Sequence, residues 1–124
     1  MAKPTILVVD DNRDNCALAQ ATLEDDDCNV IIAMSGAAAL TAFETKRPDC
    51  VLLDVRMPGM DGIETAHRIS ERHPDVVVVL ISVEESAAIA TAVERSGAAA
   101  LVRKQEFGPA MLRRLWSTYK SSDL

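Results

Sequence analysis

The sequence lacks any long hydrophobic run: its longest uninterrupted apolar stretch spans only residues 76–81. A membrane-spanning helix needs roughly 20 apolar residues, so we expect no membrane association. The N-terminus, from Met1 to Pro4, also lacks an apolar signal region. We therefore expect a cytoplasmic protein rather than an exported one.

Cysteines are few and widely spaced, and basic residues are outnumbered. An odd count of three cysteines gives neither a disulfide framework nor a paired metal motif. We expect Cys16, Cys28 and Cys50 to be small buried side chains in a reducing compartment. Lys and Arg number 13 against 19 Asp and Glu, a net charge of −6. Because this charge repels phosphate backbones, we expect no direct nucleic-acid binding by this chain.

The length of 124 residues predicts a single domain over residues 1–124, with a core at about 4–119 and a short polar tail at 120–124. Strand-like apolar runs alternate with segments of helical period. The predicted strands are 5–9, 30–34, 50–53, 76–81 and 99–102; the predicted helices are 14–26, 37–46, 62–72, 86–96 and one starting at Pro109. Continuous apolar strands predict an α/β fold, a doubly wound parallel sheet covered on both faces.

Polar residues that carry chemistry follow four of the five predicted strands. Asp10 and Asp11 follow the first strand and Asp54 the third, while Ser82 follows the fourth and Lys104 the fifth. Ligands of such sheets sit outside the carboxyl ends of the strands. We therefore expect these five side chains to converge at one edge of the sheet.

This set of residues predicts phosphoryl chemistry. Three neighbouring carboxylates repel each other unless a cation enters, and oxygen-only ligands suit Mg²⁺. A carboxylate can attack a phosphoryl group to give an acyl phosphate, whose oxygens a metal, a hydroxyl and a lysine would stabilise. Asp54 is the best candidate nucleophile, because it stands alone at the central strand while Asp10 and Asp11 form the metal pair.

Four motifs surround these residues. They are Val8-Val9-Asp10-Asp11, the run from Leu52 through Asp54 to Gly62, Ile81-Ser82, and Gly97-Ala98 followed by Val102-Arg103-Lys104. Together they resemble the receiver domain of two-component response regulators, over about residues 4–119. The resemblance implies a flavodoxin-like fold, with five parallel strands in the order 2-1-3-4-5 and five flanking helices.

The resemblance also implies a function and a site. A sensor histidine kinase or histidine phosphotransfer protein would donate the phosphoryl group. In the implied site, Asp54 is the phospho-acceptor. The implied Mg²⁺ ligands are Asp10, Asp11, Asp54 and the backbone carbonyl of Arg56. Ser82 and Lys104 would bind the phosphoryl oxygens. The face formed by the fourth helix, fifth strand and fifth helix would then change its affinity for a downstream protein, and homodimers through this face are common in the family. The chain would be a regulatory phospho-acceptor rather than an enzyme, although it would contribute to its own phosphotransfer and autodephosphorylation.

Three positions depart from the family pattern. Leu101 stands at the switch position, which usually holds an aromatic residue whose rotamer changes on phosphorylation. Gln105 follows Lys104 where many members have a proline in a cis bond. Because a non-proline cis bond costs roughly 3 kcal/mol, we expect either a trans peptide with a shifted loop or a strained cis bond. Asp27 stands where a glycine often ends the first helix, and we interpret it as a solvated acidic helix end.

Some alternatives remain open at this stage. An ion pair between Arg56 and Glu84 could slow hydrolysis of the acyl phosphate, but two solvated side chains are an equal interpretation. Leu101 leaves room for a receiver-like interaction scaffold that works without phosphorylation. A phosphatase with an aspartyl nucleophile is disfavoured, since Arg56 stands where its second acid is needed. A flavodoxin-like flavin carrier is also disfavoured, because Asp10 and Asp11 would repel the flavin phosphate. The start at Met1 and the lack of a charged linker favour a stand-alone regulator over a receiver cut from a longer protein.

Overall fold

The apolar runs form strands and the segments between them form helices in the computed structural model. It describes residues 3–25, 27–57, 59–83 and 86–122, with only the backbone of residues 116 and 118–122. The strands are β1 (Thr5–Val9), β2 (Asn29–Ala33), β3 (Cys50–Asp54), β4 (Val77–Ser82) and β5 (Ala100–Arg103). The helices are α1 (Arg13–Asp25), α2 (Gly36–Lys46), α3 (Gly62–Arg72), α4 (Ala87–Ser96) and α5 (Pro109–Ser122), with a 3₁₀ turn, η1 (Lys104–Glu106), after β5.

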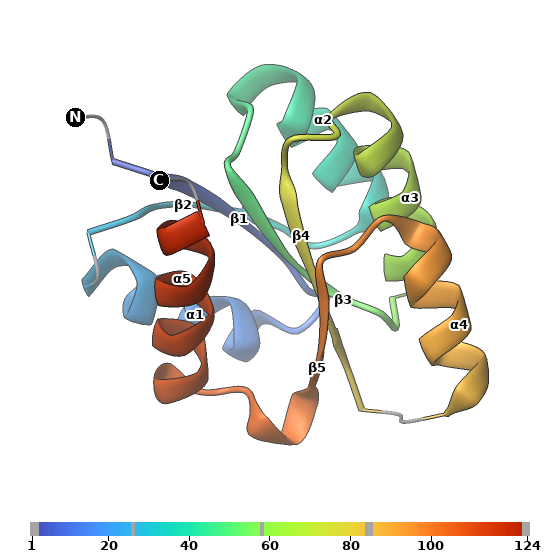
Figure 1. The fold of residues 1–124 in the computed structure, drawn as a ribbon. Coiled ribbons are helices and arrows are strands. Elements are labelled where there is room, and N and C mark those ends of the chain that lie inside the picture. Colours follow the sequence, from blue (N-terminus) through green and yellow to red (C-terminus); the bar gives the residue numbers. More distant parts are fainter. Residues whose placement is uncertain (1–2, 26, 58, 84–85, 123–124) are drawn as a thin grey trace.

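The five strands form one parallel sheet in the order β2-β1-β3-β4-β5, as the sequence predicts. Helices α1 and α5 cover one face of the sheet, while α2, α3 and α4 cover the other (Figure 1). The chain reverses its direction of strand addition between β1 and β3. Such a reversal opens a crevice at the carboxyl ends of the strands, where ligands of this fold class bind.

The continuous apolar strands are explained by burial on both faces of the sheet. One core cluster contains Leu7, Val51 and Leu80 and lies under α2, α3 and α4. The other contains Ile6, Leu52 and the three buried cysteines and lies under α1 and α5. Strand β3 is buried over its whole length, whereas β5, at the edge of the sheet, is only partly buried. The centre of the sheet is therefore the better supported platform for a site.

The predicted elements are confirmed, with small shifts at their ends. Strand β2 begins and ends one residue earlier than predicted, because the side chain of Met34 lies outside the core with 38% exposure. Strand β5 begins and ends one residue later than predicted. Helix α5 runs to Ser122, so the first three residues of the predicted tail are helical.

Local capping explains where the helices begin and end. Ser35, Asp61 and Ser86 accept hydrogen bonds from backbone N–H groups at the starts of α2, α3 and α4. Gly97 ends α4 with a φ of 84°, as predicted from its position. Asp27 has a φ of 68°, so it adopts the left-handed conformation that a glycine would adopt more easily.

Candidate functional site

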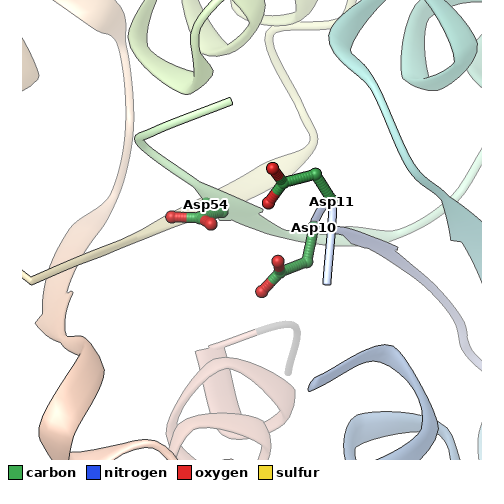
Figure 2. Close-up of side chains that lie close together, drawn as sticks. All are labelled: Asp10, Asp11 and Asp54. Atoms are coloured by element: carbon green, nitrogen blue, oxygen red, sulfur yellow. The ribbon is translucent and has the colours of Figure 1, made fainter. Parts of the chain in front are cut away.

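Three carboxylates meet at the carboxyl ends of the two central strands (Figure 2). Asp54 is the last residue of β3, and Asp10 directly follows β1. Since Val9 is the register partner of Leu53, the two aspartates leave the sheet side by side. One oxygen from each of Asp10, Asp11 and Asp54 lies within 4.8 Å of the others. Asp10 and Asp54 are buried and Asp11 is exposed, so the cluster opens to solvent on one side.

Lys104 brings a positive charge to this cluster from the edge of the sheet. Its Nζ atom donates a hydrogen bond to Oδ2 of Asp54 at 3.0 Å and lies 3.8 Å from Oδ2 of Asp10. Three carboxylates and one ammonium group leave the cluster with a formal charge of −2 when all four are ionised. This charge matches a divalent cation, and the oxygen donors are of the kind that Mg²⁺ prefers.

Burial and neighbouring charge perturb two of these groups. Burial raises the pKa of Asp54; the Lys104 hydrogen bond opposes this shift without cancelling it, and the negative charge of Asp10 adds to it. For Lys104, burial lowers the pKa, but the hydrogen bond and attraction to Asp54 outweigh it, so the pKa is raised overall. The ammonium therefore stays charged at neutral pH, while the ionised Asp54 carries an electrostatic penalty.

The loop after β1 contains site residues that the sequence analysis missed. Asp10 accepts hydrogen bonds from the backbone N–H of Asn12 at 2.9 Å and from the side-chain amide of Asn15 at 3.1 Å. Asn12 in turn accepts from the backbone N–H groups of Asp14 and Asn15, so it caps the start of α1. The preference of asparagine for helix caps was a signal that could have identified Asn12. These contacts fix the orientation of the Asp10 carboxylate.

Strand β3 and the start of α3 are packed tightly behind Asp54. The backbone N–H of Gly62 donates to the carbonyl of Val55 at 2.8 Å. A Cβ atom at position 62 would overlap the carbonyl oxygen of Asp54 and lie 2.7 Å from its carbonyl carbon. On the other side, the backbone N–H of Arg56 donates to Oδ1 of Asp54 at 3.3 Å. The Asp54 main chain is therefore held by direct contact with a neighbouring helix.

Of the other predicted residues, Ser82 and Arg56 lie near the same edge of the sheet. Ser82 ends β4 and is 2% exposed; it follows Ile81, the register partner of Asp54. Arg56 is exposed, and the predicted ion-pair partner Glu84 lies outside the described residues. Leu101 is partly buried and packs against the core cluster under α2, α3 and α4.

The peptide bond between Lys104 and Gln105 is trans, because the described residues include no cis peptide bond. Of the two predicted geometries for this loop, the trans peptide is therefore confirmed and the strained cis bond is wrong. The loop is the 3₁₀ turn η1, which begins at Lys104 itself and is closed by a hydrogen bond from the Phe107 N–H to the Lys104 carbonyl at 2.9 Å.

Comparison with known sequences identifies a family. Residues 6–115 match the family model described as the response regulator receiver domain. The chain is 46% identical over 74 residues to the sensor histidine kinase GacS of Pseudomonas protegens, covering 56% of this chain and 8% of that protein. It is 41% identical over 99 residues to the transcriptional regulatory protein ZraR of Salmonella typhimurium, covering 80% of this chain and 22% of that protein. The chain thus spans less than a quarter of the length of either relative.

Solved structures share the same fold. The chemotaxis protein CheY4 of Vibrio cholerae superposes with a TM-score of 0.89 at 25% identity, covering 94% of this chain and 98% of that chain. A CheY-like receiver domain from Methanospirillum hungatei superposes with a TM-score of 0.87 at 23% identity, covering 98% of this chain and 94% of that chain. The fold is therefore that of CheY-like receiver domains.

Proposed function

Because the chain belongs to the response regulator receiver domain family, we propose that it is a phospho-acceptor whose Asp54 takes a phosphoryl group from a phosphohistidine. One observation carries the proposal: the buried carboxylate of Asp54 lies between a cationic donor, Lys104, and two further carboxylates, Asp10 and Asp11. The donor would be a sensor histidine kinase or a histidine phosphotransfer protein in the cytoplasm.

The residues present fit a bound Mg²⁺ ion. The donor set is purely oxygen, and the pKa of Asp54 is raised by burial and by repulsion from Asp10, with Lys104 opposing the shift only in part. We propose that Asp10, Asp11, Asp54 and the backbone carbonyl of Arg56 hold the ion. When bound, Mg²⁺ would offset the negative charge that gathers when a carboxylate meets a phosphoryl group.

Asp54 would act as the nucleophile, and Lys104 and Ser82 would bind the transferred phosphoryl group. A carboxylate oxygen of Asp54 forms the new P–O bond while the P–N bond of the phosphohistidine breaks, and the imidazole, which carries a proton on its other ring nitrogen, leaves neutral with the electron pair of that bond. The Lys104 ammonium, already 3.0 Å from Asp54, would donate to an oxygen of the transferred group, and the Ser82 hydroxyl would donate to another. The same residues would support autodephosphorylation, when water replaces the carboxylate.

We further propose that the phosphorylated state is read at the face formed by α4, β5 and α5. Leu101 lies on β5, the strand that precedes Lys104 directly. Leucine cannot provide the aromatic rotamer change that is usual in the family, so output here needs a different conformational change. If phosphorylation leaves partner affinity unchanged, the scaffold alternative is favoured. The downstream target is a protein, and a homodimer through this face stays a prediction.

The test is direct phosphorylation of the purified chain. Incubation with acetyl phosphate and Mg²⁺ should add the mass of one phosphoryl group, as measured by intact-protein mass spectrometry. The Asp54→Asn variant should show no adduct, while Asp75→Asn, which changes an exposed carboxylate before β4, should behave as wild type. An adduct that persists in Asp54→Asn would contradict the assignment. Phosphotransfer profiling against candidate kinases would then identify the partner.

A further inference from the structure

Lys104 directly follows the last residue of β5 that pairs with β4. The last register pair between β4 and β5 is Ser82 with Arg103, so Lys104 is the first residue beyond the paired strand. Strand β5 is an edge strand of four residues, none of them fully buried. Yet the Lys104 side chain must reach the buried Asp54 on the central strand. The geometry of the backbone at Lys104 therefore decides whether that contact forms.

The two neighbours of Lys104 are joined through their side chains. The Gln105 amide is assigned with its oxygen toward the Arg103 guanidinium, because only that orientation lets the oxygen accept hydrogen bonds from Nε and Nη2, at 3.3 and 3.1 Å. Both side chains are exposed. Two donors on a rigid planar group converge on one acceptor, which restricts both side chains. The bridge thus links residues 103 and 105 and closes a ring of atoms that includes the backbone of Lys104.

We propose that Arg103 and Gln105 are positioning residues that hold Lys104 against Asp54. A proline at position 105, common in the family, would fix the backbone through its own ring. Gln105 has no such ring, and its bridge to Arg103 adds a side-chain restraint to the backbone hydrogen bond that closes η1. The proposal rests on the proposed function, because Lys104 matters here as the group that would bind the phosphoryl oxygens.

The distances explain why a small restraint has a large effect. The Lys104 ammonium lies 3.0 Å from one carboxylate and 3.8 Å from another, at the end of a flexible four-carbon chain. A displacement of about 1 Å at such a group can slow a reaction by roughly 100-fold. Because the bridge acts through Lys104 and touches no reacting atom, we expect a smaller loss, about tenfold.

The first test is the rate of phosphorylation by acetyl phosphate at saturating Mg²⁺. Gln105→Ala should react about tenfold more slowly than wild type, while its Mg²⁺ affinity, measured by calorimetry, stays within about twofold. Gln105→Glu keeps an acceptor for Arg103 and should stay within about threefold of the wild-type rate. In an Arg103→Ala background, Gln105→Ala should cause no further loss, since both changes break the same bridge.

The matched control is Gln20→Ala, which removes a comparable side-chain hydrogen bond, from Gln20 to Glu24, on helix α1. This variant should phosphorylate at the wild-type rate. A Gln105→Ala variant as fast as Gln20→Ala would overturn the proposal. So would an unchanged tenfold loss for Gln105→Ala in the Arg103→Ala background.

A second measurement does not depend on phosphorylation. The chain has four lysines, so selective labelling should resolve the Lys104 ammonium signal by NMR, with Lys104→Arg to assign it. The Asp54 hydrogen bond should slow its exchange with water in the wild type, and Gln105→Ala should speed that exchange. Unchanged exchange in Gln105→Ala would refute the positioning role. If the wild type gave no phosphoryl adduct, the proposed function would fail, and this signal would still test the bridge.

Discussion

Replacing Gly62 by alanine should damage both the stability of the fold and the site. The new Cβ would lie 2.7 Å from the carbonyl carbon of Asp54 and 2.8 Å from the Cα of Val55. Carbon atoms pack best at about 3.5–4.0 Å, so helix α3 and the end of β3 must separate by roughly 1 Å. Both neighbours are backbone atoms of a fully buried strand and its extension, and they cannot rotate away as the end of a side chain would.

The expected magnitude follows from two losses. Overpacking of this kind costs about 1–3 kcal/mol, and weakening the hydrogen bond from Gly62 to Val55 adds about 1 kcal/mol. We expect unfolding free energy to fall by about 3 kcal/mol and the melting temperature by about 10 °C. A shift of about 1 Å at Asp54 should also slow phosphorylation by up to roughly 100-fold.

Urea and thermal unfolding followed by circular dichroism would measure the stability, and acetyl phosphate labelling would measure the rate below the transition. Gly108→Ala is the matched control, because a Cβ there meets no atom within 4 Å. It should cost less than about 1 kcal/mol, the loss expected at the start of a helix. A Gly62→Ala variant as stable as Gly108→Ala would refute the close-approach argument.

Three further predictions follow from the same structure. Asp54→Asn should raise the melting temperature in metal-free buffer. Because its pKa is raised in the folded state, the Asp54 carboxyl stabilises the fold at low pH. This contribution is lost as the pH rises from 3.8, the ordinary pKa of the group, through the raised pKa. Mg²⁺ should then stabilise the wild type more than the variant; equal melting curves from pH 3 to 7 would contradict this. Ser70→Ala should add about 1 kcal/mol to the urea unfolding free energy, because the buried Ser70 hydroxyl has no hydrogen-bond partner among the described residues; a loss of stability would show a missed partner. Asp27→Gly should add about 0.5–1 kcal/mol by relieving the left-handed backbone, since its exposed ion pair with Lys3 contributes little; a lower melting temperature would show that the ion pair matters more.

The fold and the convergence of the site residues could be predicted because both follow from strand ends. In a parallel sheet all carboxyl ends lie at one edge, so a polar residue after each apolar run is placed without knowledge of the packing. Asp10, Asp54 and Lys104 are such residues, and the structure brings them together. The first residue of β5 was harder to predict, because Ala99 and Ala100 are both small, and burial does not distinguish a strand that starts at one from a strand that starts at the other.

The contacts that orient the site could not be predicted in the same way. The close approach of Gly62 to Asp54 depends on how α3 packs against β3, which no local pattern encodes. The bond from Asn15 to Asp10 depends on where the first turn of α1 points. The bridge between Arg103 and Gln105 was hidden because the only local signal at position 105 is the absence of a proline. The approach of Gly62 depends on tertiary packing, and the other two contacts depend on local side-chain orientation, which residue type alone does not fix.

Sheet order divides the site into a fixed part and an adjustable part. The three carboxylates come from β1 and β3, which have neighbouring strands on both sides. Lys104 comes from β5, which has a neighbour on one side only and is partly exposed. A change of charge at Asp54 therefore acts on Asp10 and Asp11, which follow a strand paired on both sides. Through Lys104 it also acts on β5, which is paired on one side only. Because that same strand carries Leu101, we expect a movement of Lys104 to reach the proposed α4-β5-α5 output face without any aromatic side chain.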